Sequence, residues 1–164
     1  MDDLDAQIEA GLSLEREGKE REAIEHFRAL AERYPGNARV RFEYAGAYDF
    51  AGYEAEAIPI YQQALELGLS GEYLPRAYVQ LGSSLRNVGQ YQEAIRILDE
   101  GLARLPDYTP LRIFRAFALY SAGQSEKAIV DLLEALLAHP DSPALDGYGR
   151  AIRYYADEIN SVKN

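Results

Sequence analysis

The chain has 164 residues, of which 48% are hydrophobic and 27% are charged, a composition typical of a globular domain large enough to bury a core. It contains no cysteine, which excludes disulfides, thiolate metal sites and a cysteine nucleophile. Residues 1–20 are acidic and lack the basic start and apolar run of a secretory signal, and no stretch of 18 residues is continuously apolar. We therefore expect a cytoplasmic protein that does not enter a membrane.

The formal net charge is −10, and it is concentrated in the first half of the chain. Residues 1–74 carry 7 basic and 16 acidic side chains (−9), whereas residues 75–164 carry 10 and 11 (−1). Such a chain repels a phosphate backbone, so nucleic acid is not expected as a partner. Two interpretations stay open: the acidic residues select a neutral or basic ligand, or they keep a helical array soluble.

One short frame occurs four times along the chain, a glycine followed five residues later by the pair Ala-Ile. The alanines of the four frames are Ala23, Ala57, Ala94 and Ala128, at intervals of 34, 37 and 34 residues. Self-similarity at this period is typical of helical solenoids, in which each repeat is one small supersecondary unit. The sequence therefore predicts four stacked units.

Two apolar stripes with helical spacing follow each other within the third unit. They consist of Tyr78, Leu81, Gly82 and Leu85, and of Tyr91, Ala94, Ile95, Leu98 and Leu102. Gly82 and Ala94 leave no bulk where two antiparallel helices cross, so the two backbones can approach closely. Gly89, between the stripes, supplies a permissive backbone for the turn.

This order of residues resembles the tetratricopeptide repeat, a 34-residue helix–turn–helix unit. The matching residues are Tyr78, Leu81, Gly82, Gly89, Tyr91, Ala94, Leu98 and Pro106 in the third unit, Gly11, Gly18, Ala23, Phe27 and Pro35 in the first, Ala45, Tyr48, Gly52, Ala57, Tyr61 and Ala64 in the second, and Ala116, Leu119, Gly123, Ala128, Leu132, Ala135 and Pro140 in the fourth. The resemblance implies an all-α right-handed superhelix of four repeats, at about 4–37, 38–71, 75–108 and 109–142. We expect residues 1–164 to form a single domain.

Residues 143–160 do not repeat the frame, but they form an amphipathic pattern. Leu145, Tyr148, Ile152, Tyr155 and Ile159 share one face of a helix. Because a stack of repeats leaves its last apolar face bare, we expect this helix to cap the fourth repeat. An interaction tail is the alternative.

Local signals place several helix boundaries. Asn37 is expected to cap the second unit, and Thr109 to cap the fourth with Pro110 at the first helical position. The 37-residue interval locates a three-residue insertion near 68–71. The next helix is therefore expected to begin up to one turn early, with Pro75 in its first turn.

Pro59 does not fit the pattern, because it falls inside the second helix of the second unit. A proline there removes a backbone hydrogen bond. Either that helix bends, or its regular part begins later than the pattern indicates.

Known catalytic motifs are missing from the sequence. His26 and His139 are far apart, and the chain has neither a phosphate-binding Gly-x-x-x-x-Gly-Lys loop nor a Gly-x-Ser-x-Gly elbow. We predict no catalytic residue, metal ligand or cofactor, and hence no enzyme.

In tetratricopeptide proteins the first helices of successive repeats line a concave groove that holds peptides or helices. By this resemblance the groove residues are Ile8, Leu12 and Glu15, then Phe42, Gly46, Asp49 and Phe50, then Val79, Ser83, Arg86 and Asn87, and finally Ile113, Phe117 and Tyr120. Such a set suits an apolar helix or an extended peptide with a few fixed hydrogen bonds. The alternative is that several of these residues pack between adjacent repeats.

Arg112 and Arg115 depart from the pattern in the fourth repeat, at positions where apolar residues are usual in tetratricopeptide repeats. Pairing with Asp99 or Glu100 of the preceding unit is the expected explanation, and recognition of an anion is the alternative.

These observations together predict a non-catalytic scaffold or adaptor that binds a peptide or helix of a partner protein. Two alternatives remain open. One is a chaperone-like holder of secreted or aggregation-prone segments, since the chain is similar in size, acidity and repeat count to type III secretion chaperones. The other is self-association as a homodimer through exposed aromatic faces.

Overall fold

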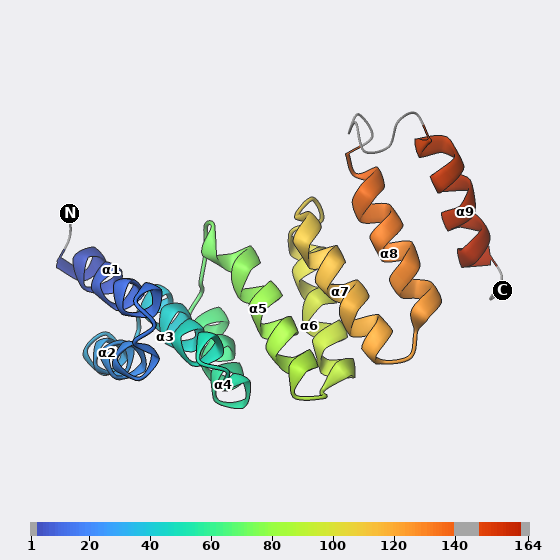
Figure 1. Ribbon diagram of the computed structural model, residues 1–164. Coiled ribbons are helices and arrows are strands. Elements are labelled where there is room, and N and C mark those ends of the chain that lie inside the picture. The colour runs from blue at the N-terminus through green and yellow to red at the C-terminus, as the bar shows by residue number, and fades with distance from the viewer. Residues whose placement is uncertain (1–2, 140–147, 162–164) are drawn as a thin grey trace.

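The computed structural model describes residues 3–139 and 148–161, and every regular element within these ranges is an α-helix. The helices are α1 (Asp3–Arg16), α2 (Glu20–Arg33), α3 (Ala38–Phe50), α4 (Glu54–Glu66), α5 (Tyr73–Asn87), α6 (Tyr91–Arg104), α7 (Thr109–Ser121), α8 (Ser125–Leu137) and α9 (Gly149–Ser161). Figure 1 shows them in a row, with the two ends of the chain at opposite ends of the molecule. This arrangement confirms the all-α solenoid, with a further helix after the fourth pair.

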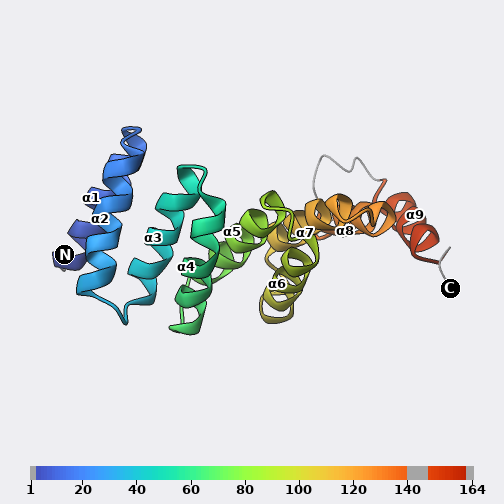
Figure 2. The same ribbon diagram turned by 90° about the horizontal axis from the view of Figure 1, so that it is seen from below.

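The row of helices is twisted. In Figure 1 α2 is seen nearly end-on, and it lies in the plane of Figure 2, whereas α8 and α9 lie close to the plane of Figure 1 and are foreshortened in Figure 2. Each second helix packs on the first helix of the next pair, and α5 also packs directly on α7. The repeats therefore form one continuous stack of neighbours.

The repeated glycines close the turns within the pairs. Gly89 has a φ of 82°, a left-handed conformation that strains any residue with a Cβ atom. The equivalent glycines of the other three pairs have φ angles between 71° and 78°. This geometry explains why each frame begins with glycine.

Close approach of two helices explains the small residues inside the pairs. A Cβ atom added to Gly82 in α5 would lie 2.6 Å from Cγ of Leu98 in α6. In the first pair, a Cβ atom added to Gly11 would lie 2.5 Å from the ring of Phe27. Leu98 and Phe27 are both fully buried, so neither has space into which it can retreat.

Most of the predicted helix boundaries agree with the structure. Asn37 caps α3, and its side chain accepts a hydrogen bond from the Val40 N–H at 3.0 Å. After the insertion α5 begins early, at Tyr73, with Pro75 in its first turn. The prediction for Thr109 was wrong by one residue, because Tyr108 occupies the cap position and caps nothing with its side chain.

Pro59 lies within α4, which runs without a break from Glu54. The expectation of a later start is therefore wrong. Proline has no N–H to offer the carbonyl of Ala55, and both residues are exposed, so water can replace the missing donor.

The last helix, α9, packs against α8 and begins at Gly149. Ala156 is fully buried, and Ile152 and Ile159 are half-buried. Tyr148 and Tyr155 were expected on the covered face but are 67% and 58% exposed. Residues 143–147, including Leu145, lie outside the described residues. None of the helices in the described ranges is long and apolar enough to span a bilayer.

Replacing Gly82 by alanine tests the close crossing of α5 and α6. The added methyl group would overlap the Leu98 side chain, and we expect the free energy of unfolding to fall by about 1–3 kcal/mol. Gly46→Ala is the matched control, because its Cβ atom would meet only the Tyr61 hydroxyl at 4.0 Å. We expect that variant to gain up to about 1 kcal/mol from helix propensity. Urea unfolding followed by circular dichroism measures both, and equal effects would contradict the packing argument.

Candidate binding surface

The predicted groove residues all lie on the first helix of a pair, that is on α1, α3, α5 or α7. We call the side of the molecule that they mark the first-helix face. Their side chains differ widely in exposure and in bonding, and these differences decide which of them can meet a ligand.

Two of the predicted groove residues belong to the core. Ile8 is 5% exposed and packs in the cluster between α1, α2 and α3. Phe42 is 2% exposed, with its ring 5.9 Å from the ring of Tyr61 and 5.8 Å from that of Tyr73. The groove prediction is wrong for both, because neighbouring helices cover them. Leu12 is half-buried against the cluster that contains Ile8, and Val79 is half-buried against the large core cluster that contains Phe42.

Asp49 links the second pair to the third. It accepts hydrogen bonds from the Ser84 hydroxyl of α5 at 2.9 Å and from the Tyr61 hydroxyl of α4 at 3.3 Å. Burial raises the pKa of Asp49, and the two hydrogen bonds oppose that rise. Two of the acceptor sites of this carboxylate are thus used within the stack.

Arg86 and Asn87 also bond within the stack. Nε of Arg86 donates to Oγ of Ser121 at 2.9 Å and to the carbonyl of Phe117 at 3.3 Å, which joins α5 to α7. The Asn87 amide donates to Glu54 of α4 at 3.3 Å. These polar residues hold successive repeats together, and their role toward a ligand stays a prediction.

Glu15 occupies in the first repeat the position that Asp49 has in the second. The hydroxyl groups that donate hydrogen bonds to Asp49 have no equivalent around Glu15. At the positions of Tyr61 and Ser84 the first interface has Phe27 and Ala47, neither of which can donate a side-chain hydrogen bond. Within the described part of the chain, Oε1 of Glu15 is buried and has no hydrogen-bond partner.

The surroundings of Glu15 disfavour its charged form. Burial raises its pKa to about 7, the negative charge of Glu43 adds to the rise, and Arg16 opposes it. Glu43 accepts a hydrogen bond from Arg39 at 2.5 Å, and burial raises the pKa of Glu43 as well. The first interface therefore contains an acid that ionises near neutral pH.

The most exposed predicted residues are aromatic. Tyr120 is 68%, Phe50 60% and Phe117 44% exposed, while Ser83 and Ile113 are half-buried. The ring of Phe117 packs edge-on against Phe114, at a centroid distance of 5.8 Å, which limits its rotation. The structure thus brings Phe117 and Tyr120 together, one turn apart on α7, and leaves Phe50 on α3.

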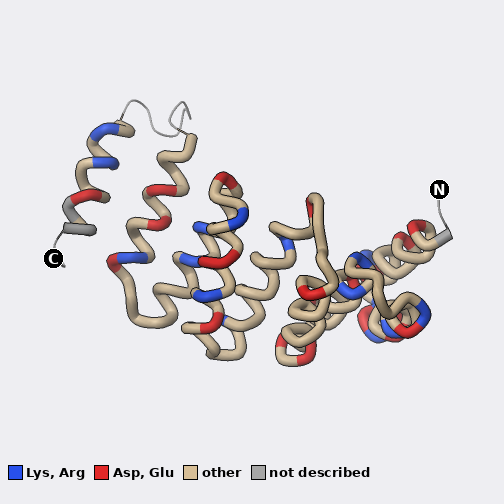
Figure 3. The backbone as a smooth tube through the Cα atoms, turned by 180° about the vertical axis from the view of Figure 1, so that it is seen from behind, with Lys and Arg blue, Asp and Glu red and all other residues tan. Residues whose placement is uncertain are grey.

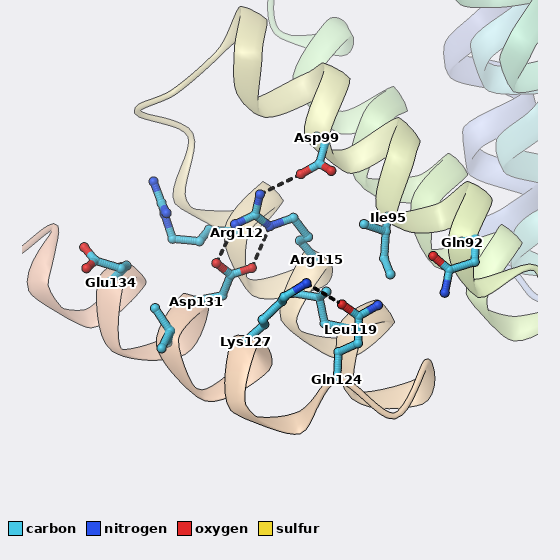
Figure 4. A pocket seen from close by; sticks show the side chains of 11 residues that line it. Gln92, Ile95, Asp99, Arg112, Arg115, Leu119, Gln124, Lys127, Asp131 and Glu134 are labelled. Atoms are coloured by element: carbon cyan, nitrogen blue, oxygen red, sulfur yellow. Dashed lines mark hydrogen bonds and ion pairs between the residues drawn. The ribbon is translucent and has the colours of Figure 1, made fainter. Parts of the chain in front are cut away.

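A pocket of ≈ 680 Å³ lies between α6, α7 and α8, lined in part by Arg112 and Arg115 (Figure 4). Arg115 donates two hydrogen bonds to Asp131, each at 2.6 Å, and a third to Asp99 at 2.6 Å. The predicted pairing with Asp99 is confirmed. Glu100 is not its partner, since it accepts a hydrogen bond from Tyr78.

Asp131 was missed by the sequence analysis, although a signal for it exists. Arg115 stands where the third repeat has Leu81, and Asp131 where it has Ile97. Opposite charges that replace two apolar residues within one repeat indicate an ion pair between its helices.

The charges in this pocket balance. Arg112, Arg115 and Lys127 are offset by Asp99, Asp131 and Glu134. Arg112 has no bonded partner among the described residues, but its surroundings carry no positive excess that would attract an anion. The described ranges also lack any group of three His, Asp or Glu side chains that could hold a metal ion.

Two family profiles match this chain of helix pairs. A profile described as Tetratrico peptide repeat matches residues 36–159, and one described as Tetratricopeptide repeat matches residues 4–47. The first alone covers more than half of the chain. The chain belongs to the tetratricopeptide repeat family. No curated protein matches it.

Solved structures named MamA share the fold of this tetratricopeptide protein. A crystal structure of MamA superimposes with a TM-score of 0.72 and 18% identity, over 84% of this chain and 74% of the other. The structure of MamA 41-end from Desulfovibrio magneticus RS-1 has a TM-score of 0.72 and 16% identity, over 100% of this chain and 98% of the other. The structure of MamA AMB-1 has a TM-score of 0.73 and 20% identity, over 85% of this chain and 81% of the other. At these identities the likeness concerns the fold alone.

Removing one partner of the Arg115–Asp131 pair tests its structural role. Arg115→Ala leaves Asp131, whose side chain is 5% exposed, without its main partner, and we expect a loss of about 3 kcal/mol in unfolding free energy. The double variant Arg115→Met/Asp131→Leu restores the apolar types that the third repeat has at these positions, Leu81 and Ile97, and should regain most of that loss. Equal losses in the single and double variants, measured by urea unfolding, would contradict this assignment.

Glu15→Gln tests the unpartnered acid. The folded-state pKa of about 7 lies above the ordinary 4.5, so ionisation destabilises the folded protein as pH rises from 4.5 through 7, and below 4.5 the effect vanishes. The variant should therefore match wild type at pH 4.5 and exceed it at pH 8, by about 1–2 kcal/mol after allowance for partial exposure.

Glu32→Gln, which removes the same charge from an exposed position, is the control for Glu15→Gln. We expect its unfolding free energy to follow wild type across this range. A pH profile of Glu15→Gln parallel to that of the control would rule out a raised pKa at Glu15.

Proposed function

We propose that this protein is a non-catalytic scaffold that binds a peptide or helix of a partner protein on the first-helix face of α7. The observation that carries the proposal is the exposed aromatic pair Phe117 and Tyr120. At the equivalent positions the third repeat has Ser83 and Arg86, and the second has Gly46 and Asp49. Aromatic side chains bury a large area with few rotatable bonds, which is why they anchor many protein interfaces.

The charge of the chain limits the kind of ligand that we propose. The face continues from α7 toward repeats that carry −9 over residues 1–74, so an acidic peptide would be repelled as it extended along the stack. The ligand that fits best has apolar anchors for Phe117 and Tyr120, with neutral or basic residues on the side of α5 and α3.

Selection from a random peptide library tests this proposal. Peptides enriched on the wild-type protein should be apolar with neutral or basic flanks. The variant Phe117→Ala/Tyr120→Ala should weaken their binding at least about tenfold in fluorescence anisotropy, because truncating such anchors costs more than 1 kcal/mol. Tyr53→Ala/Tyr91→Ala, which truncates two exposed aromatic residues outside α7, should bind as wild type does. Equal binding by both double variants would exclude α7 as the site.

A further inference from the structure

The fourth repeat leaves bare a surface that the first three repeats cover. In each second helix, the residues one, four and eight positions after the frame alanine form a stripe. The middle residues of the first three stripes, Phe27, Tyr61 and Leu98, are fully buried. They lie at the crossing with the first helix of their own pair, and the first helix of the next pair packs on the same second helix. In α8 the equivalent residues are Ile129, Leu132 and Leu136, which are 47%, 42% and 38% exposed. We call these three residues the terminal stripe.

α9 packs on a different side of α8. Its Arg153 pairs with Glu134, and Val130 is the apolar residue of α8 that is buried on that side. A helix advances about 100° per residue, so Leu132 and Leu136 both lie about 200° around α8 from Glu134. Figure 1 shows α9 beside α8, at the end of the row. Among the residues that the structure describes, nothing therefore covers the terminal stripe.

Tyr155 of α9 and Tyr148, which directly precedes α9, extend this open surface. Tyr155 lies about 200°, and Tyr148 about 140°, around the helix axis from Arg153. The Arg153–Glu134 pair marks one face of the layer that α8 and α9 form. The two tyrosines therefore lie on the opposite face of this layer, together with the terminal stripe. Both are more than half exposed. The terminal stripe, Tyr148 and Tyr155 together form what we call the terminal face.

The amino-terminal helix α1 of one copy does not suit the terminal face of another copy in a head-to-tail contact. α7 reaches α6 through Leu111, Phe114 and Ala118, which belong to or border the large core cluster. At the equivalent positions α1 has Ala6, Glu9 and Ser13, and Arg16 bonds to both Glu9 and Ser13. Seating α1 on the stripe would bury this charged group in an apolar contact.

Charge favours a second copy placed face to face. Residues 75–164 carry only −1, whereas residues 1–74 carry −9, and Figure 3 shows both signs of charge on α8 and α9. A two-fold contact through the terminal face brings the two nearly neutral halves together and keeps the acidic halves far apart. The five side chains offer roughly 400 Å² of apolar surface per copy, at about 150–200 Å² for each whole side chain. Two copies together would bury roughly 800 Å² through these side chains, less than the roughly 1,200 Å² of a standard interface, so we expect the dimer to be weak and reversible.

We propose that this protein forms a reversible two-fold homodimer in which the terminal faces of two copies pack against each other. The dimer leaves the first-helix face of α1, α3 and α5 uncovered. It extends the function proposed above without depending on it, since none of the five side chains of the terminal face belongs to the predicted peptide site.

Sedimentation velocity from micromolar to near-millimolar concentration tests the dimer. The weight-average mass of wild type should rise toward twice the chain mass of 18.4 kDa, and Leu132→Glu should raise the dissociation constant at least about tenfold. Leu67→Glu is the matched control, because Leu67 is 41% exposed at the end of α4, and it should associate as wild type does. Ile129→Glu provides a second disruption, and circular dichroism confirms that each variant folds.

Oxidative cross-linking tests the geometry. The chain has no cysteine, so Leu132→Cys introduces a single thiol at the centre of the terminal stripe. A two-fold contact brings the two thiols together, and mild oxidation should yield a covalent dimer that Leu67→Cys does not form.

Either of two results would overturn the proposal: wild type monomeric at every concentration, or dimerisation unchanged in both Leu132→Glu and Ile129→Glu. The Phe117→Ala/Tyr120→Ala variant separates the two functions, because it should lose peptide binding and still dimerise. Leu132→Glu should show the converse, a weakened dimer with peptide binding kept.

Discussion

The stack depends on two helix backbones crossing closely within each pair, with a glycine or an alanine at the crossing. Gly82 makes this possible in the third pair and Gly11 in the first, where any added carbon atom would enter a buried leucine or phenylalanine. Close crossings bring the apolar stripes of the second helices into reach of the next pair. A wider crossing would open a void along each interface, and void volume is costly in a close-packed interior.

The repeats share this backbone geometry but are joined by different side-chain chemistry. The residue eight positions before the frame alanine faces the next first helix in the first three repeats, where it is Glu15, Asp49 and Arg86 in turn. Asp49 and Arg86 have partners in the next repeat, whereas the buried Oε1 atom of Glu15 has none among the described residues. The first interface therefore contains an acid whose pKa lies near 7 and whose buried Oε1 atom has no hydrogen-bond donor among the described residues.

The sequence predicted those features that depend on local backbone geometry. The turn glycines, the Asn37 cap and the early start of α5 all follow from a few neighbouring residues. Burial depends on residues that arrive from elsewhere: Tyr73, from the next pair, covers Phe42 and turns a groove candidate into core. The Arg115–Asp131 pair joins residues on two helices, so it becomes visible only when repeats are compared position by position. The exposure of Tyr155 depends on which side of α8 the last helix occupies.

The two ends of the row differ in a way that matters for anyone who wishes to lengthen it. A helix pair spliced in after α8 would find Ile129, Leu132 and Leu136 already spaced to receive its first helix. The same pair fused ahead of α1 would meet Glu9 and Arg16, and those surface positions would first have to become apolar. Growth of this array by gene duplication or by protein engineering is thus directional, and it proceeds from the carboxyl-terminal side.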